Sequence, residues 1–201
     1  MTKLIFATNN AHKVKELNAI VGQGISIISL KEAGIIIDIP EPHETLSANA
    51  TEKSRTIHRL TGSDCFGEDS GLEVAALNGE PGVRSARYAG ENRSFEDNIE
   101  KLINKLSGID NRKAQFRTII SLIFENKEYL FEGTCAGEIT TSPHGSGGFG
   151  YDPIFKPDGA EITFAEMSLN DKNRYSHRKK AADKMIKFLH QLYGKDQNQH
   201  A

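Results

Sequence analysis

The sequence predicts an α/β protein, because short apolar runs typical of strands alternate along the chain with longer stretches of helical periodicity. Its 201 residues suit one large domain or two lobes in close contact. Hydrophobic residues at 37% and charged residues at 26% give the balance of an ordinary soluble globule. We therefore expect one folded unit over residues 1–194, followed by a disordered polar tail over residues 195–201.

Strands and helices follow one another in the first part of the chain. The apolar pattern predicts strands at 3–7, 25–30 and 35–39, a helix after the first strand that reaches Val21, and a helix from Thr45 to Gly62. Lys53 lies on the inward stripe of this second helix. A lysine there either extends its ammonium past the edge of the core or reaches an anion held in a cleft.

The most informative stretch is residues 67–74, Gly-Glu-Asp-Ser-Gly-Leu-Glu-Val. Apolar residues precede and follow it, and Gly71 is expected to turn the chain between two strands. The neighbouring Glu68 and Asp69 would then bring two carboxylates to one spot, which favours a hard cation or proton transfer. The alternative is an acidic β-turn that Gly71 closes and that binds nothing.

The second part of the chain adds two helices and a hairpin. A capping box at Ser94 begins an amphipathic helix that ends at Gly108. Residues 114–125 and 128–140 read as a long β-hairpin joined through Asn126 and Lys127. The last helix is predicted to begin after Ser176 and to end at Gly194.

Three further segments carry possible ligand chemistry. Residues 8–13, Thr-Asn-Asn-Ala-His-Lys, join a strand to a helix N-terminus, where phosphate binds readily, although an Asn-capped helix without a ligand fits as well. Residues 142–153 combine four glycines with Phe149, Tyr151 and Asp152, which suits a planar heterocycle; a flexible surface hairpin is the alternative. The basic run 177–180 opens the last helix, where an anion nearby would explain it.

Charge and cysteine content exclude several classes. The net charge of −2 provides no general polycation for nucleic acid. Cys65 and Cys135 stand far apart without partners at metal-ligand spacing, so reduced thiols in a cytoplasm are expected. The chain opens directly into a strand and contains no apolar stretch of membrane-spanning length, so we expect a cytoplasmic protein that neither enters a membrane nor binds nucleic acid.

Five motifs in this order resemble the inosine triphosphate pyrophosphatase family, also called HAM1-like, over roughly residues 3–193. The motifs are residues 8–13, residues 68–72, Pro81-Gly82 with Ser85-Ala86-Arg87-Tyr88, residues 147–153, and Ser176-His177-Arg178. The resemblance implies a homodimeric, magnesium-dependent hydrolase that converts ITP, dITP and XTP to the monophosphate and pyrophosphate. It also implies a mixed, elongated central sheet flanked by helices, with two lobes around a deep cleft.

The resemblance also implies roles for individual residues. Asp69 would be the catalytic proton acceptor, and the metal ligands would be Glu41, Glu68 and Asp69. The substrate-binding residues would be Thr8, Asn9, Asn10, Ala11, His12, Lys13, Lys53, Ser70, Phe149, Gly150, Tyr151, Asp152, Lys172, His177 and Arg178. The chain departs from the family pattern at residues 42–45, which replace a Thr-Gly stretch, and at Glu68, where bacterial members often have Asp.

Two other functions are compatible with parts of the sequence. A non-catalytic nucleic-acid binder could use the basic residues between Arg174 and Lys180, although the net charge and the carboxylates oppose it. A pyrophosphatase for other modified or canonical nucleotides would use the same groups, and relative turnover of ITP and ATP would distinguish it.

Overall fold

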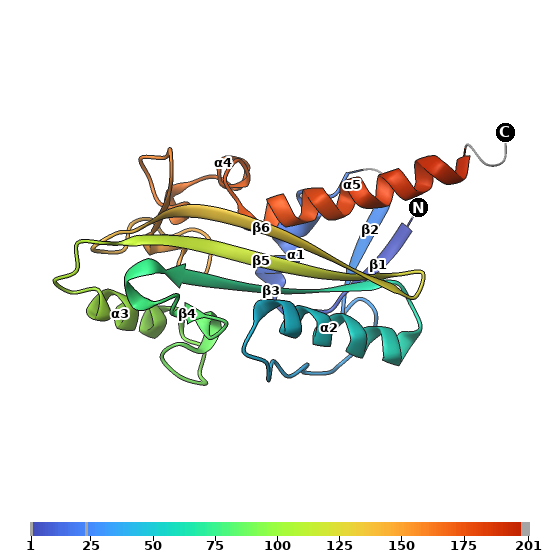
Figure 1. Ribbon diagram of the computed structural model, residues 1–201, viewed down its shortest axis with the longest axis horizontal. Coiled ribbons are helices and arrows are strands. Elements are labelled where there is room, and N and C mark those ends of the chain that lie inside the picture. The colour runs from blue at the N-terminus through green and yellow to red at the C-terminus, as the bar shows by residue number, and fades with distance from the viewer. Residues whose placement is uncertain (1, 23, 198–201) are drawn as a thin grey trace.

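The computed structural model describes residues 2–22 and 24–197, which fold around one seven-stranded mixed sheet (Figure 1). The strand order is β2-β1-β3-β5-β6-β7, and β4 pairs with β3 beside that path. Strand β1 is parallel to β2 and β3, whereas the other pairs are antiparallel. The strands are β1 (Thr2–Phe6), β2 (Ile25–Ser29), β3 (Cys65–Val74), β4 (Pro81–Gly82), β5 (Lys113–Phe124), β6 (Lys127–Ile139) and β7 (Phe155–Pro157).

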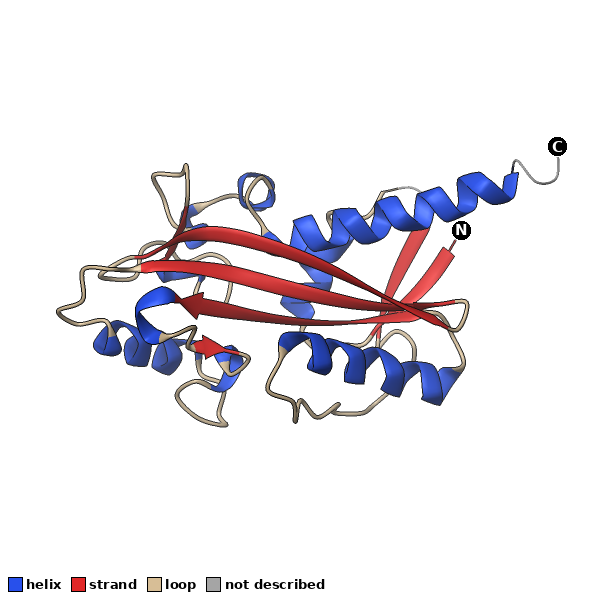
Figure 2. Ribbon diagram, in the orientation of Figure 1, coloured by secondary structure: helices blue, strands red, loops and turns tan. Residues whose placement is uncertain are grey.

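Helices cover both faces of the three long strands, β3, β5 and β6, which run along the length of the molecule (Figure 2). The helices are α1 (Ala11–Asn18), α2 (Leu46–Thr61), α3 (Phe95–Lys105), α4 (Leu169–Asn173) and α5 (His177–Gln197), with short 3₁₀ helices η1 (Ala75–Leu77), η2 (Ser85–Arg87), η3 (Asp152–Ile154) and η4 (Phe164–Glu166). Helices α2 and α3 lie on one side of the long strands and α5 lies on the other (Figure 1). Over residues 2–22 and 24–197, no helix is both long and apolar enough to cross a membrane.

The buried apolar residues divide the molecule into two lobes. The α3 lobe has a core of Leu72, Val74, Leu102, Phe116, Phe155 and Phe164 with their neighbours. The α5 lobe has one core on each face of the sheet, because successive residues of β1 alternate between Leu4 and Phe6 on the α5 side and Ile5 on the other. The long strands belong to both lobes. The predicted elongated sheet with two lobes is therefore confirmed.

Strand β3 differs from the predicted strand pair. It is one continuous strand of ten residues that pairs with β5 along its whole length, including Gly71 opposite Arg117. Gly71 does not turn the chain. A Cβ atom there would collide with the carbonyl group of Gly82, so glycine allows β4 to approach the strand. The Glu68–Asp69 pair consequently lies in the middle of a strand and not in a turn.

Three other predicted boundaries also shift. Residues 35–39 form no strand, because they pair with none of the described strands, and Ile36 is 97% exposed. The hairpin turn is Glu125–Asn126, one residue earlier than predicted, and both residues have positive φ. Helix α5 passes through the predicted end at Gly194 and reaches Gln197, so residues 195–197 are helical, whereas 198–201 lie outside the described residues.

The caps and the cysteines agree with the sequence. The hydroxyls of Thr45, Ser94 and Ser176 accept backbone N–H bonds from the first turns of α2, α3 and α5. Both cysteines are buried free thiols, and burial raises the pKa of Cys65 to about 12 and that of Cys135 to about 11. Neither thiol is therefore a nucleophile near neutral pH.

Candidate active site

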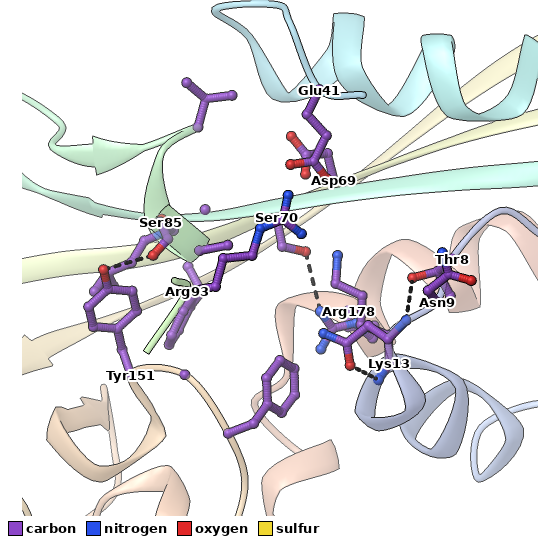
Figure 3. A pocket seen from close by; sticks show the side chains of 18 of the residues that line it. Thr8, Asn9, Lys13, Glu41, Asp69, Ser70, Ser85, Arg93, Tyr151 and Arg178 are labelled. Atoms are coloured by element: carbon purple, nitrogen blue, oxygen red, sulfur yellow. Dashed lines mark hydrogen bonds between the residues drawn. The ribbon is translucent and has the colours of Figure 1, made fainter. Parts of the chain in front are cut away.

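The principal pocket lies between the two lobes and collects residues from most of the predicted motifs (Figure 3). Fifteen of the predicted site residues line it: Thr8, Asn9, Asn10, Lys13, Glu41, Lys53, Asp69, Ser70, Phe149, Gly150, Tyr151, Asp152, Lys172, His177 and Arg178. Ala11, His12 and Glu68 do not line it. The sequence motifs therefore converge on one cleft, although not every member of each motif faces the pocket.

The loop between β1 and α1 forms the cationic end of the pocket. The side-chain oxygen of Asn10 caps α1 by accepting the N–H groups of His12 and Lys13 at 2.9 and 3.2 Å. The hydroxyl of Thr8 accepts the N–H of Asn10 at 3.1 Å, which fixes the turn before the helix. This places the Lys13 ammonium at the N-terminus of α1, where the helix dipole also favours an anion.

Glu68 and Asp69 do not share one spot, contrary to the sequence-based expectation. Successive side chains of a strand point to opposite faces of the sheet, so the two carboxylates face different helices. Asp69 faces α2, where it meets Lys53, whereas Glu68 faces α5, where it meets Arg178. The acid pair is thus divided between two sites on either side of β3.

On the α2 side, Lys53 bridges two carboxylates. Its ammonium lies 2.5 Å from a carboxylate oxygen of Glu41 and 3.1 Å from one of Asp69. Arg87 donates to the other oxygen of Glu41 at 3.0 Å, and the Asn49 amide donates to Asp69 at 3.3 Å. A cation therefore already occupies the position between the two acids.

The surroundings of Asp69 and Glu41 shift the pKa values of these two carboxyl groups in opposite directions. Burial raises the pKa of Asp69, and the attraction of Lys53 and Lys13 only partly offsets this effect. Burial acts in the same direction on Glu41, but Lys53, Lys13 and Arg87 outweigh it and lower the pKa of Glu41 to about 2. Asp69 is therefore the stronger base of the pair and Glu41 the permanent anion.

Glu41 and Asp69 fit a hard divalent cation. Magnesium is commonly held by one or two carboxylates together with waters and substrate phosphates, and Lys53 shows that the two acids can share a positive charge. Within residues 2–22 and 24–197 no group of three or more His, Cys, Asp or Glu side chains could hold a metal ion. A metal here would accordingly depend on waters and phosphate oxygens for its remaining ligands.

Glu68, which the sequence assigns to the metal, has other partners in the structure. Both of its oxygens accept bonds from the Arg178 guanidinium, at 2.9 and 3.0 Å, and Lys13 lies 3.2 Å away. The Ser70 hydroxyl also donates to it at 2.6 Å. Although burial opposes ionisation, these cations hold the pKa of Glu68 well below its ordinary value. Its side chain is fully buried, so its geometry is that of a buried counter-ion.

Helices α4 and α5 and the glycine-rich loop form the opposite wall. The Lys172 ammonium lies 2.7 Å from Glu16 and 2.6 Å from Asp152, and the same Asp152 oxygen accepts the Phe149 N–H at 2.9 Å. Arg178 reaches the second oxygen of Glu16. The two basic side chains are thereby held by one buried carboxylate on α1.

The aromatic residues of the glycine-rich loop have different environments. Phe149 is partly exposed and stacks on the His12 ring at a centroid distance of 5.1 Å. Tyr151 is buried, and its hydroxyl donates to the Ser85 carbonyl at 2.9 Å. Phe149 is therefore the more exposed of the two rings, although Lys172 and Arg178 lie 5.2 and 5.5 Å from its centroid, whereas Tyr151 anchors the loop. Although His12 does not line the pocket, its ring packs against that of Phe149.

His177 is a buried, neutral imidazole at this wall. Its ring stacks on Phe116 at 4.6 Å, and its Nδ1 atom has no hydrogen-bond partner within the described chain. Burial, followed by the charges of Arg178 and Lys172, places the pKa of His177 well below its ordinary value. A buried unpaired polar atom is costly, so this nitrogen is available to a ligand or a water.

Two of the four residues of the basic run 177–180 are buried. His177 and Arg178 face the cleft and are buried, and Lys179 pairs with Asp183 at 2.6 Å. Lys180 donates to the Thr134 carbonyl at 2.9 Å. The run therefore forms no continuous exposed patch of the kind that binds phosphate backbones.

The sequence missed several residues that complete the site. Glu16 holds Lys172 and Arg178, Asn49 contacts Asp69, and Ser85 and Arg93 line the pocket. Glu16 lies 156 positions before Lys172 in the chain, so only folding reveals the pair. One sequence signal could have identified Glu16, namely a charged residue among the apolar positions of a short helix.

The fold and the site define a class: an α/β protein with a long mixed sheet and a cleft between two lobes that is lined by the N-terminal loop of α1 and by two carboxylates that share a lysine. The Ham1 family model matches residues 4–188, and the chain belongs to this family.

Similar proteins agree with that assignment. A protein of Flavobacterium johnsoniae named dITP/XTP pyrophosphatase is 48% identical over 187 residues, covering 93% of this chain and 97% of the relative. One of Porphyromonas gingivalis with the same name is 47% identical over 190 residues, covering 94% and 98%. The solved structure of the Staphylococcus aureus Ham1 protein superimposes with a TM-score of 0.86 at 40% identity and covers 95% of this chain and all of that one.

Proposed function

We propose that this protein hydrolyses non-canonical purine nucleoside triphosphates, ITP or dITP and XTP or dXTP, to the monophosphate and pyrophosphate. The observation that carries the proposal is the Glu41–Lys53–Asp69 cluster, which lies in the same pocket as the phosphate-binding end of α1. Relatives 47–48% identical bear the name dITP/XTP pyrophosphatase, which supports the same substrate class for this chain.

The phosphates belong at the cationic end of the pocket. The α1 N-terminus and Lys13 would bind the triphosphate, and Lys53 would neutralise it beside the acids. Glu41 and Asp69 would hold Mg²⁺, which, when bound, neutralises phosphate charge and makes water more acidic. Because Lys53 lies between the two acids, its ammonium would have to leave that position for a metal to be held there.

Asp69 is the proposed proton acceptor. Its carboxylate removes a proton from water while the water oxygen bonds to the α-phosphorus, and the bond from that phosphorus to the bridging oxygen breaks as pyrophosphate leaves with the electron pair. The raised pKa of Asp69 strengthens it as a base, whereas Glu41 would remain ionised. The protein needs no covalent nucleophile for this reaction.

The purine belongs against the α4 and α5 wall. Phe149 offers the partly exposed ring for stacking, and the unpaired nitrogen of His177 and the Arg178 guanidinium offer polar groups to the base edge. Hypoxanthine and xanthine carry a 6-oxo acceptor where adenine carries an amino donor. Donors here would favour the former, because adenine would leave them unpaired.

A turnover panel of ITP, XTP, dITP, ATP and GTP with Mg²⁺ tests this function. We expect pyrophosphate as the inorganic product and a strong preference for ITP, dITP and XTP over ATP and GTP. Release of orthophosphate would show that water attacks another phosphorus and would disprove the assignment. Equal turnover of ITP and ATP would favour a pyrophosphatase for other or canonical nucleotides instead.

We also propose that the active protein is a homodimer that acts in the cytoplasm. Sedimentation analysis at enzyme concentrations used for turnover would test it, and a monomer with full activity would contradict it.

A further inference from the structure

The charges around the pocket form two clusters that each balance within the described residues. On the α2 side the cluster is Glu41, Lys53, Asp69 and Arg87. On the α5 side the cluster is Lys13, Glu16, Glu68, Asp152, Lys172 and Arg178. Each has equal numbers of carboxylates and cations. The lysines and Arg178 therefore do not by themselves give the pocket a net positive charge.

Arg93 stands apart from both clusters. It lines the pocket and is exposed, and no carboxylate of residues 2–22 and 24–197 forms an ion pair with it. Figure 3 shows its side chain reaching from the loop before α3 toward the middle of the pocket. Among the described residues that line the pocket, Asp38 is the other charged residue that belongs to neither cluster, and its negative charge repels phosphate. Arg93 is thus the uncommitted cation of the site.

The backbone holds Arg93 in an unusual conformation. Its φ is +53°, in the left-handed region that side-chain-bearing residues rarely adopt. The next residue, Ser94, caps α3 by accepting the Asp97 N–H at 3.1 Å, and the Arg93 N–H donates to the Gly90 carbonyl at 3.3 Å. Strained positions of this kind are frequent at ligand-binding sites, and this one directs a guanidinium into the cleft.

We propose that Arg93 is a further substrate-binding residue, whose guanidinium binds the β- and γ-phosphates and stays with the leaving pyrophosphate. The inference rests on the proposed function above. A planar guanidinium can bind two phosphate oxygens at once, and no carboxylate of the described chain occupies this one. In the reaction it offsets the charge that the leaving group gains as the bridging bond breaks.

Binding of pyrophosphate and of IMP tests whether Arg93 contacts the leaving group. Pyrophosphate resembles the leaving group, whereas IMP does not. Binding of inorganic pyrophosphate and of IMP is measured by calorimetry with Mg²⁺, together with the KM and kcat for ITP. The variants are Arg93→Asn, which tolerates positive φ, and Arg93→Lys, which keeps the charge but not the two-point geometry. The matched control is Arg84→Asn, because Arg84 is also exposed but lies outside the pocket.

We expect Arg93→Asn to weaken pyrophosphate binding about 10- to 100-fold, the scale of losing a bond to a charged group, and to raise the KM for ITP in parallel. IMP binding should stay unchanged, Arg93→Lys should be intermediate, and Arg84→Asn should match the parent. Unchanged pyrophosphate affinity, an equal loss for IMP, or no pyrophosphate binding by the parent would overturn the inference. Orthophosphate as the product from ITP would instead defeat the proposed function, since the binding measurement needs no turnover.

Discussion

Substitution of Asp69 by asparagine tests the centre of the proposed mechanism. The change keeps the shape of the side chain but removes the charge that faces Lys53 at 3.1 Å. Asp69 would lose both its capacity to accept a proton and its share of the metal, so we expect kcat to fall by about 10²-fold or more. That loss corresponds to about 2.7 kcal/mol of transition-state stabilisation.

The assay is pyrophosphate release from ITP at saturating Mg²⁺, measured across pH. The raised pKa of Asp69 predicts that the parent gains activity as pH rises through that pKa, and Asp69→Asn should lack this limb. Glu73→Gln is the matched control, because Glu73 lies on the same strand and pairs with Arg117 outside the pocket. Near-parental turnover of Asp69→Asn would refute the assignment and transfer the role to Glu41.

Stability provides an independent measurement for the same variant. A carboxyl group with a raised pKa in the folded state contributes stability below its unfolded pKa of 3.8, and that contribution is lost as pH rises through the folded pKa. Without metal at neutral pH, the Asp69 charge therefore costs free energy of folding. We expect Asp69→Asn to leave the Tm unchanged or raised, and a large decrease would show that inactivity reflects unfolding.

Four other substitutions follow from the geometry. Glu41→Gln should raise the Mg²⁺ concentration required for half-maximal turnover. Glu68→Gln should mainly lower the Tm. If a magnesium titration showed the larger change for Glu68→Gln, Glu68 would be the metal ligand. Arg178→Ala should reduce kcat/KM for ITP more than for ATP, and equal losses for both nucleotides would place Arg178 on the phosphates. It should also destabilise the fold, by no more than the about 3–5 kcal/mol of a fully broken buried pair, because Glu16 and Glu68 each lose one of two cationic partners. Gly71→Ala should lower the Tm through the collision with Gly82, and an unchanged melting curve would contradict the close approach of β4 to β3.

The sequence by itself determined which segments form the cleft. Local chemistry is sufficient for these predictions: the Asn10 cap, the hydroxyl caps of α2, α3 and α5, and the glycines of the loop before Phe149 all act on neighbouring residues. The family resemblance added the order of the motifs, and the family model confirms it over residues 4–188. Fifteen predicted residues consequently do line the pocket.

Only the tertiary structure decided how the charges are paired. The sequence predicted a turn at Gly71 because a turn and the close approach of Gly82 both require glycine. Strand β3 is instead continuous, which places Glu68 and Asp69 on opposite faces of the sheet. Lys172 and Arg178, which pair with Glu16 and Glu68, lie more than a hundred residues away on α4 and α5, beyond any local pattern. Burial and long-range Coulomb interactions, which distinguish a base from a permanent anion, exist only once these elements pack together.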